Sequence, residues 1–253
     1  MARCYFPGCE NHANTKEHIP PKSFFPDSKK TNLMTVKSCK THNNEKTKDD
    51  IYALANICVN CITNDKGDAL EVFESSVKPQ LMHNNESLFK KIFKDLSKKN
   101  NGYKFQVDSE RLNSFFECLT HGVLFKKTNK KINLDHYRMN HLYMNLEERR
   151  EDGGAHDGLA FMKNYWRNYL LGDSPVAEIL EFKSQNKSGY SHDIYKVKII
   201  GADFLKLSES ADYSSSISVI HEFYGHFTVV SALTRVASFE NTPIYLKPQT
   251  IQQ

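Results

Sequence analysis

The sequence predicts an α+β fold made of three successive parts: a small N-terminal module, a helical middle and an α+β C-terminal part. About the first fifty residues are rich in Cys, His, Asn and Lys and show no helical periodicity. Apolar residues then recur at spacings of three and four, as they do on one face of a helix. The last third carries runs of β-branched and aromatic residues, which are typical of strands.

The boundaries of these parts follow from changes in pattern along the chain. We expect the N-terminal module to span residues 1–60, the mainly helical region residues 61–152 and the C-terminal region residues 153–253. The second boundary rests on Gly153 and Gly154, which mark a turn. With 253 residues and 39% hydrophobic content, the chain is long enough to bury a core.

Helices are expected in the middle of the chain, where apolar residues keep helical spacing. The stretches concerned are "DDIYALANICVNCITNDKGDALEVFESSVKPQL" (49–81), "ESLFKKIFKDLSKK" (86–99) and "SERLNSFFECLTHGVLFKK" (109–127). Asp49 and Asp50 suit a helix N-terminus because negative charge there complements the helix dipole. The middle is therefore predicted to be predominantly helical.

The C-terminal region is predicted to combine one helix with several strands. A helix is expected at "LAFMKNYWRNYLL" (159–171). Strands are expected at "IYKVKII" (194–200) and "SISVIHEFYGHFTVVSAL" (216–233), which are rich in β-branched and aromatic residues. This region is accordingly α+β, with no role evident from its residues.

Charge and hydropathy limit the classes of protein that fit this chain. The net charge of +4 and the pI near 8.6 are compatible with a polyanionic partner but do not establish one. No run of about 18 apolar residues occurs, and "MARCYFPGCE" has no apolar segment of the signal-peptide kind. We therefore expect no membrane partner and a cytoplasmic location.

The cysteines and one histidine of the N-terminal module form two closely spaced pairs. Tetrahedral zinc is usually held by two such pairs, because each pair closes a small ring around the ion. Cys4-x4-Cys9 and Cys39-x2-His42 meet this requirement. The sequence therefore predicts a structural Zn²⁺ site with these four ligands. Cys58-x2-Cys61 is the competing pair, although its flanks read as a helix whose cysteines belong in a core.

Between the two pairs lies the dipeptide Glu17-His18, and Asn43-x2-Lys46 follows them. A neutral histidine can take a proton from water, while a carboxylate and an amide oxygen offer hard ligands to a magnesium-type ion. These are the groups that attack on a phosphodiester requires: a base for the water and a cation for the charge that develops on phosphate.

Residues 4–52 resemble the HNH endonucleases, specifically the branch whose motif is flanked by zinc ligands. The resemblance rests on the two metal-binding pairs, the acidic-His dipeptide and the Asn-x2-Lys. The resemblance implies a ββα-metal nuclease module in which His18 is the general base. It implies that Glu17 and Asn43 bind a catalytic Mg²⁺ or Mn²⁺ ion and that Lys46 lies near phosphate. The Asn that braces the loop between the two strands corresponds to Asn32.

This chain departs from the family pattern in two places. The last zinc ligand is His42, where Cys is more usual, and the acid is Glu17, where Asp also occurs in the family. Spacing alone also leaves Asn44 open for some part of the roles given to Asn32 and Asn43.

No catalytic role is expected for two further motifs. "HEFYGH" (221–226) is one residue longer than the zinc-protease motif, and its flanks alternate as a strand does. The stretches "FKKIFKDLSKK" and "FKKTNKK" carry clustered lysines that would suit phosphate contacts, or simply a solvated helix face.

The sequence thus predicts a metal-dependent endonuclease that hydrolyses DNA. The resemblance to the family further implies a role as a bacterial antiphage defence effector. The main alternative is a catalytically inactive zinc-stabilised module that binds nucleic acid or a protein. Retention of Glu17, His18 and Asn43 together argues against that alternative. Besides DNA, the possible partners are a second copy of the chain (a homodimer) and a separate regulatory or ATPase subunit. Any ATPase would have to be a separate subunit, because the chain has no nucleotide-binding signature of the P-loop kind.

Overall fold

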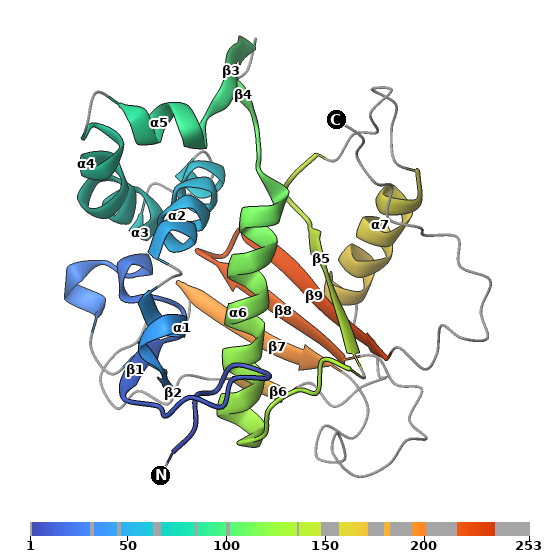
Figure 1. The fold of residues 1–253 in the computed structure, drawn as a ribbon. Helices are drawn as coiled ribbons and strands as arrows, with labels where there is room; N and C mark the ends of the chain where they lie inside the picture. The colour runs from blue at the N-terminus through green and yellow to red at the C-terminus, as the bar shows by residue number, and fades with distance from the viewer. Residues whose placement is uncertain are drawn as a thin grey trace, which may run out of the picture.

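Among the residues that the structure describes, the largest element is a five-stranded antiparallel sheet with the strand order β5-β9-β8-β7-β6 (Figure 1). The computed structural model describes residues 2–30, 33–44, 47–62, 67–83, 86–99, 102–135, 137–147, 157–171, 180–182, 194–200 and 217–235. The strands are β5 (Tyr137–Tyr143), β6 (Leu180–Phe182), β7 (Tyr195–Ile200), β8 (Ile217–Phe223) and β9 (Phe227–Arg235). The strand segments expected in the C-terminal region are therefore confirmed.

A tight turn joins β8 to β9 within the segment "HEFYGH". Tyr224 and Gly225 both have positive φ angles, of 51° and 66°, and the His226 N–H donates to the Phe223 carbonyl at 3.0 Å. His221 lies in β8 and His226 in the turn, so the two imidazoles do not share a helical face. The interpretation of this segment as strand rather than as a zinc-protease helix is confirmed.

The long helix α6 (Ser109–Thr128) crosses one face of the sheet (Figure 1). It begins where the Asp108 side chain accepts from the Arg111 N–H at 3.3 Å, and it ends at Asn129, whose φ is 56°. Its buried residues recur at helical spacing and include Leu112, Phe116, Leu119 and Val123. These side chains pack on Ile217, Val219, Phe223 and their neighbours to form the main core.

The opposite face of the sheet is covered by α7 (Asp157–Leu171). Alternation along β8 and β9 sends Ile220 and Val230 to this side, where they form a small second cluster with Met144 and Ile200. Trp166 of α7 packs against this cluster. Tyr165 beside it is 53% exposed.

A polar network lies inside the main core, between α6 and the sheet. Both ring nitrogens of His221 have partners, because Nε2 lies 2.9 Å from Thr120 Oγ1 and Nδ1 lies 2.8 Å from the Tyr195 hydroxyl. His141 Nδ1 lies 2.8 Å from Ser231 Oγ. Burial, with a smaller contribution from His141, lowers the pKa of His221 to about 3. The imidazole of His221 is therefore neutral in the folded protein at neutral pH.

The N-terminal residues form a two-stranded antiparallel sheet followed by helices. Strand β1 (Thr15–His18) pairs with β2 (Thr35–Ser38), and two short 3-10 turns, η1 (Lys22–Phe24) and η2 (Asp27–Lys29), lie between them. Helix α1 (Lys40–Asn44) follows β2 directly.

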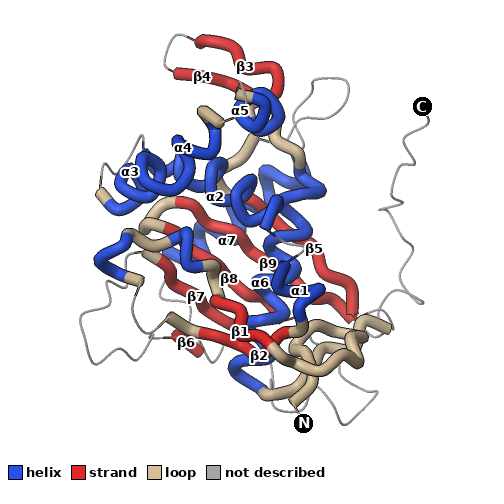
Figure 2. The backbone as a smooth tube through the Cα atoms, turned by 60° about the vertical axis from the view of Figure 1, so that its left-hand side comes forward, coloured by secondary structure: helices blue, strands red, loops and turns tan. Residues whose placement is uncertain are grey.

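Helices α2 to α5 lie together in one cluster (Figure 2), in which α2 also contacts α6 and β9. They are α2 (Thr47–Ile62), α3 (Asp68–Val72), the π-helical turn η3 (Phe73–Val77), α4 (Lys78–Leu81) and α5 (Ser87–Ile92). Cys58 and Cys61 of α2 are fully buried, as expected for core residues rather than metal ligands. Arg111 of α6 bonds to Asp49 at 2.9 Å and so ties α6 to the first turn of α2.

One predicted helix is wrong in its second half. The stretch 86–99 was expected to be helical throughout, but only α5 is helical there, and β3 (Lys94–Lys99) pairs antiparallel with β4 (Gly102–Gln106). The two strands project from α5 away from the rest of the protein in both views (Figures 1 and 2). Helical spacing of apolar residues continues past residue 93 to Leu96, but pairing with β4 decides the conformation of this segment.

The main core runs through all three predicted regions. It contains Tyr5 and Phe24 from residues 1–60, Leu112 and Phe116 from residues 61–152, and Phe223 with its neighbours from residues 153–253. The predicted boundary at Gly153 and Gly154 lies outside the described residues. No helix in the described part of the chain is long and apolar enough to cross a membrane.

Candidate functional site

Four side chains of the N-terminal segment meet in one buried group: Cys4, Cys9, Cys39 and His42. Their ligand atoms all lie within 4.8 Å of one another. Cys9 Sγ is 3.9 Å from Cys39 Sγ, and His42 Nδ1 is 3.2 Å from Cys39 Sγ and 3.7 Å from Cys4 Sγ. The group could hold a metal ion, and the two predicted ligand pairs are the ones brought together.

Local backbone geometry aims these four side chains at one point. Gly8 has a φ of 69°, which favours glycine, and it lets the chain turn so that the Cys9 N–H donates to the Phe6 carbonyl at 3.2 Å. Cys39 directly follows β2, and His42 lies one turn later in α1. The Phe6 ring stacks on the His42 imidazole with 4.2 Å between ring centroids, which fixes the orientation of that imidazole.

The environment of Cys39 favours the thiolate that a metal ion requires. Burial by itself raises the pKa of this thiol, but hydrogen bonds from the His42 backbone N–H and ring and from Cys4 and Cys9 outweigh it. The net result is a pKa of about 6 for Cys39. The backbone N–H of His42 lies 3.5 Å from the Cys39 sulfur. A deprotonated sulfur is the form that ligates metals.

Glu17 and His18 occupy the last two positions of β1, so their side chains point to opposite faces of the strand. The Tyr5 hydroxyl donates to Glu17 Oε1 at 3.0 Å. Burial, with the nearby Glu17 carboxylate, raises the pKa of Tyr5 far above its usual value, so the hydroxyl keeps its proton and stays a donor. The Glu17 carboxylate is thus oriented by a rigid buried ring.

His18 is half-buried at the end of β1. Burial lowers its pKa below the usual 6.5, the positive charge of Lys22 lowers it further, and Glu17 offsets part of this shift. The imidazole is therefore neutral at neutral pH, which is the form that accepts a proton. Its cross-strand neighbour is Thr35 of β2.

Ile19, the residue after His18, lies directly against Gly122 of α6. A Cβ placed on Gly122 would lie 2.3 Å from Ile19 Cδ1 and 3.2 Å from Ile19 Cγ1. Ile19 is 3% exposed, and its N–H donates to the Met34 carbonyl at 2.9 Å. Gly122 therefore allows α6 to approach the end of β1 closely enough to fix the backbone beside His18.

Asn43 lies in α1, which packs next to β1. Its N–H donates to the Cys39 carbonyl at 3.1 Å, so the helix that carries Asn43 starts at a cysteine of the Cys-His group. Asn32 and Lys46, the two other residues predicted for the site, lie outside the described residues. Their predicted roles remain predictions.

Two residues that act on the candidate site, Tyr5 and Lys22, were not predicted from the sequence. Tyr5 lies next to Cys4, and nothing in its spacing links it to Glu17, because the contact forms only when the N-terminal segment folds across β1. Lys22 follows His18 by four positions across Pro20 and Pro21. Its charge could have been included from the sequence, since a short proline-containing segment keeps it near the histidine.

Comparisons of this chain with protein-family models, with curated proteins and with solved structures found no match.

Proposed function

We propose that this protein is a metal-dependent endonuclease of the HNH kind that hydrolyses phosphodiester bonds in DNA. The observation that supports this most is the order of the elements around the candidate site. Two antiparallel strands are followed by a helix, with Glu17-His18 at the end of the first strand and Asn43 in the helix. The buried Cys-His group joins the second strand to that helix, as expected of a ββα-metal module held by zinc.

Zinc is the ion that best fits the Cys4, Cys9, Cys39 and His42 group. Three sulfurs and one imidazole form a common tetrahedral zinc set. With Zn–S bonds of about 2.3 Å, two sulfurs of a tetrahedron are separated by about 3.8 Å. The Cys9–Cys39 sulfur separation of 3.9 Å agrees with this value. We therefore assign this group to structural Zn²⁺.

The oxygen donors of Glu17 and Asn43 fit a hard divalent cation, Mg²⁺ or Mn²⁺, better than zinc. When bound, such an ion would stabilise the negative charge that develops on the scissile phosphate. Tyr5 orients the Glu17 carboxylate through its 3.0 Å hydrogen bond. His18 then serves as the general base that takes a proton from the attacking water, because its lowered pKa keeps it neutral.

The β3–β4 pair supports DNA as the substrate. Lys94, Lys98 and Lys104 are exposed on this projection, and Tyr103 is 70% exposed beside them. Tyr103 pairs directly with Lys98 across the two strands, so a flat ring and a positive charge lie together. Lysines bind backbone phosphates regardless of sequence, and an exposed ring can stack on a base.

Plasmid cleavage by the full chain with Mg²⁺ or Mn²⁺ tests the proposal. We expect the wild type to nick supercoiled DNA and His18→Ala to lose about 10²-fold or more of the rate, the usual range for a general base. His12→Ala is the matched control, because His12 is an exposed histidine in the same segment. All three proteins should carry about one zinc per chain.

The outcomes separate the alternatives. Equal cleavage by the wild type and His18→Ala would contradict the role of His18. A wild type that holds zinc and binds DNA, but never cuts it, would favour the inactive binding module. A single site of this kind cuts one strand, so linear product in one encounter would require a homodimer or a partner subunit.

A further inference from the structure

Two lysines lie directly opposite each other on the short β1–β2 sheet. The antiparallel register places Lys16 of β1 opposite Lys37 of β2, and both side chains are exposed. Neither ammonium group forms a hydrogen bond or an ion pair with a residue that the structure describes. In such a pair the two Cβ atoms lie about 4.5 to 5.5 Å apart, so the like charges repel and destabilise the sheet. The strand registers of the described residues contain no other directly opposed pair of like charges.

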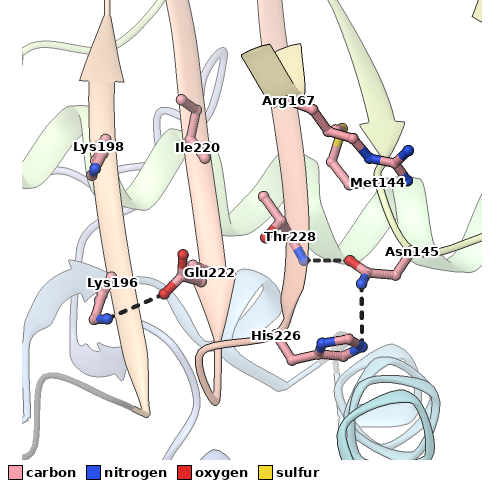
Figure 3. A pocket seen from close by; sticks show the side chains of 9 residues that line it. All are labelled: Met144, Asn145, Arg167, Lys196, Lys198, Ile220, Glu222, His226 and Thr228. Carbon is pink, nitrogen blue, oxygen red and sulfur yellow. Dashed lines mark hydrogen bonds and ion pairs between the residues drawn. The ribbon is translucent and has the colours of Figure 1, made fainter. Parts of the chain in front are cut away.

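The lysines of β7 show the arrangement that stabilises a sheet instead. Lys196 lies opposite Glu222 of β8, and its Nζ is 3.3 Å from Glu222 Oε1 (Figure 3). On the other side of β7, the register places Lys198 opposite Glu181 of β6. Each of these lysines therefore has an acidic residue directly across the sheet, and the β1–β2 pair has none.

The face of the β1–β2 sheet that carries the two lysines also carries His18. Side chains two positions apart on a strand share a face, so Lys16 lies on the same face as His18, about 7 Å away along the strand. The cross-strand neighbour of His18 on this face is Thr35. The opposite face is buried, since Val36 is 5% exposed. The solvent face of the sheet thus presents the proposed general base beside two positive charges.

Two more exposed lysines follow the ends of the two strands. Lys22 begins the turn η1 after β1, and Lys40 begins α1 after β2. Because the strands are antiparallel, these lysines follow opposite ends of the sheet. Neither ammonium group has a partner in the part of the chain that the structure describes. Positive charge therefore continues past both ends of the solvent face.

We propose that this solvent face binds the phosphate backbone of DNA on the strand that is cut, with Lys16 and Lys37 on phosphates beside the one at His18. An ammonium group contacts phosphate oxygens as a point charge and reads no bases, so this binding does not depend on the base sequence. Phosphates between the two lysines replace their repulsion by attraction to a shared negative charge. Only the position of the cut rests on the proposed function, because binding can be measured without cleavage.

Binding of a labelled DNA duplex to the full chain, by fluorescence anisotropy without added Mg²⁺ or Mn²⁺, tests the proposal. Lys16→Gln and Lys37→Gln each remove one positive charge and keep a long polar side chain. Lys196→Gln is the matched control, because it removes the same charge from a strand lysine that lies opposite an acid. Melting temperatures of the four proteins give a second readout that does not involve DNA.

We expect Lys16→Gln and Lys37→Gln each to weaken DNA binding about tenfold. Each should also reduce the slope of log affinity against log salt by about 1, and the double variant by about 2. Both should raise the melting temperature by about 1 to 3 °C, because the repulsion between the two lysines is gone. Lys196→Gln should bind DNA as the wild type does and should not melt at a higher temperature.

Unchanged affinity and slope in both β1–β2 variants would overturn the proposal, even if the wild type cuts DNA. An equal loss of affinity in Lys196→Gln would overturn it too, since net charge alone would then explain binding. Vesicles that contain phosphatidylserine are the second probe. Tighter binding of the wild type to these vesicles than to DNA, lost in Lys16→Gln and Lys37→Gln, would make this face a membrane contact instead. Loss of DNA affinity in these variants, with no cleavage by the wild type, would support the contact and contradict the proposed nuclease.

Discussion

The Tyr224 hydroxyl donates a 2.8 Å hydrogen bond to the main-chain carbonyl of Phe24, 200 positions earlier in the chain. Tyr224 lies in the β8–β9 turn, and Phe24 lies in the short helical turn that follows His18 and the two prolines. The Phe24 ring also stacks on Phe115 of α6 at 5.2 Å and contacts Phe223 at 5.4 Å. The segment after the proposed general base is therefore held by α6 and by the last strand pair of the sheet.

Tyr224→Phe should destabilise the fold by about 1 to 3 kcal/mol, because it leaves the buried Phe24 carbonyl without this donor. The ring and its packing are kept, and phenylalanine meets the same positive φ as tyrosine. Urea unfolding measures the change. Tyr103→Phe is the control, since that hydroxyl is on a side chain that is 70% exposed. Equal stability of both variants and the wild type would show that the hydrogen bond contributes little.

Gly122→Ala should lower cleavage and also the free energy of unfolding, by about 1 to 3 kcal/mol, as overpacking does in a close-packed interior. The new Cβ would meet Ile19 Cδ1 at 2.3 Å, and Ile19 adjoins His18. The double variant, Gly122→Ala with Ile19→Val, lacks that Cδ1 atom. It should recover part of the lost cleavage and part of the lost free energy of unfolding. Ser114→Ala, on the exposed side of the same helix, controls for the helix propensity of alanine. A double variant no better than Gly122→Ala would exclude Ile19 as the source.

His42→Ala should lose bound zinc, whereas His42→Cys should keep about one zinc per chain, because four thiolates also form a closed tetrahedral site. Metal content of the purified proteins, by atomic absorption, measures this. Cys118→Ser is the control, because Cys118 of α6 is not part of the metal-binding group. Full zinc in His42→Ala would mean that another residue completes the site.

Lys98→Ala and Lys104→Ala should each weaken DNA binding and reduce the slope of log affinity against log salt by about 1. Both lysines are exposed on the β3–β4 pair, so their removal should not change stability. Fluorescence anisotropy with a labelled duplex at several salt concentrations gives the slope, and Lys78→Ala is the control. An unchanged slope in both variants would place the DNA elsewhere.

The buried His221 makes stability depend on pH. Its pKa falls from the ordinary 6.5 to about 3 in the folded protein, mainly through burial. Below pH 6.5 the unfolded chain binds a proton that the folded chain does not, so stability decreases as the pH falls from about 6.5 towards 3. The contribution of His221 is about 1.4 kcal/mol per pH unit across this window.

Urea unfolding at about pH 7.5 and pH 5, on the wild type and on His221→Gln, measures this contribution. The variant should lose less stability between the two pH values than the wild type does. Both proteins keep the Cys-His group and the titratable neighbours on α6 and β5, which are Glu117, His121 and His141. The difference between the two slopes therefore belongs to His221, and identical slopes would contradict the expected shift.

Much of the secondary structure could be predicted because it is encoded locally. Helical spacing indicated α2, α6 and α7, and β-branched runs indicated β7 and the β8–β9 pair. The β3 strand could not be predicted this way, because its lysine-rich sequence also fits an amphipathic helix. Its pairing with β4 decides its conformation.

Part of the candidate site could likewise be predicted from the sequence, and part could not. The Cys4, Cys9, Cys39 and His42 group follows from short spacings, and the structure brings these four together. The contacts that support Glu17 and His18 do not follow from spacing. Tyr5 reaches Glu17 across a fold of the N-terminal segment, and Gly122 reaches Ile19 from a helix more than a hundred residues later. Such contacts depend on the tertiary fold alone.

The hydrogen bond between Tyr224 and Phe24 also sets an order of events during synthesis. Phe24 leaves the ribosome 200 residues before its partner, a delay of about 10 to 40 s at ordinary rates of translation. Until the β8–β9 turn emerges, the segment after His18 lacks both this donor and the Phe223 ring. The nascent chain therefore completes the surroundings of its proposed general base only when the last strands of the described sheet have been made.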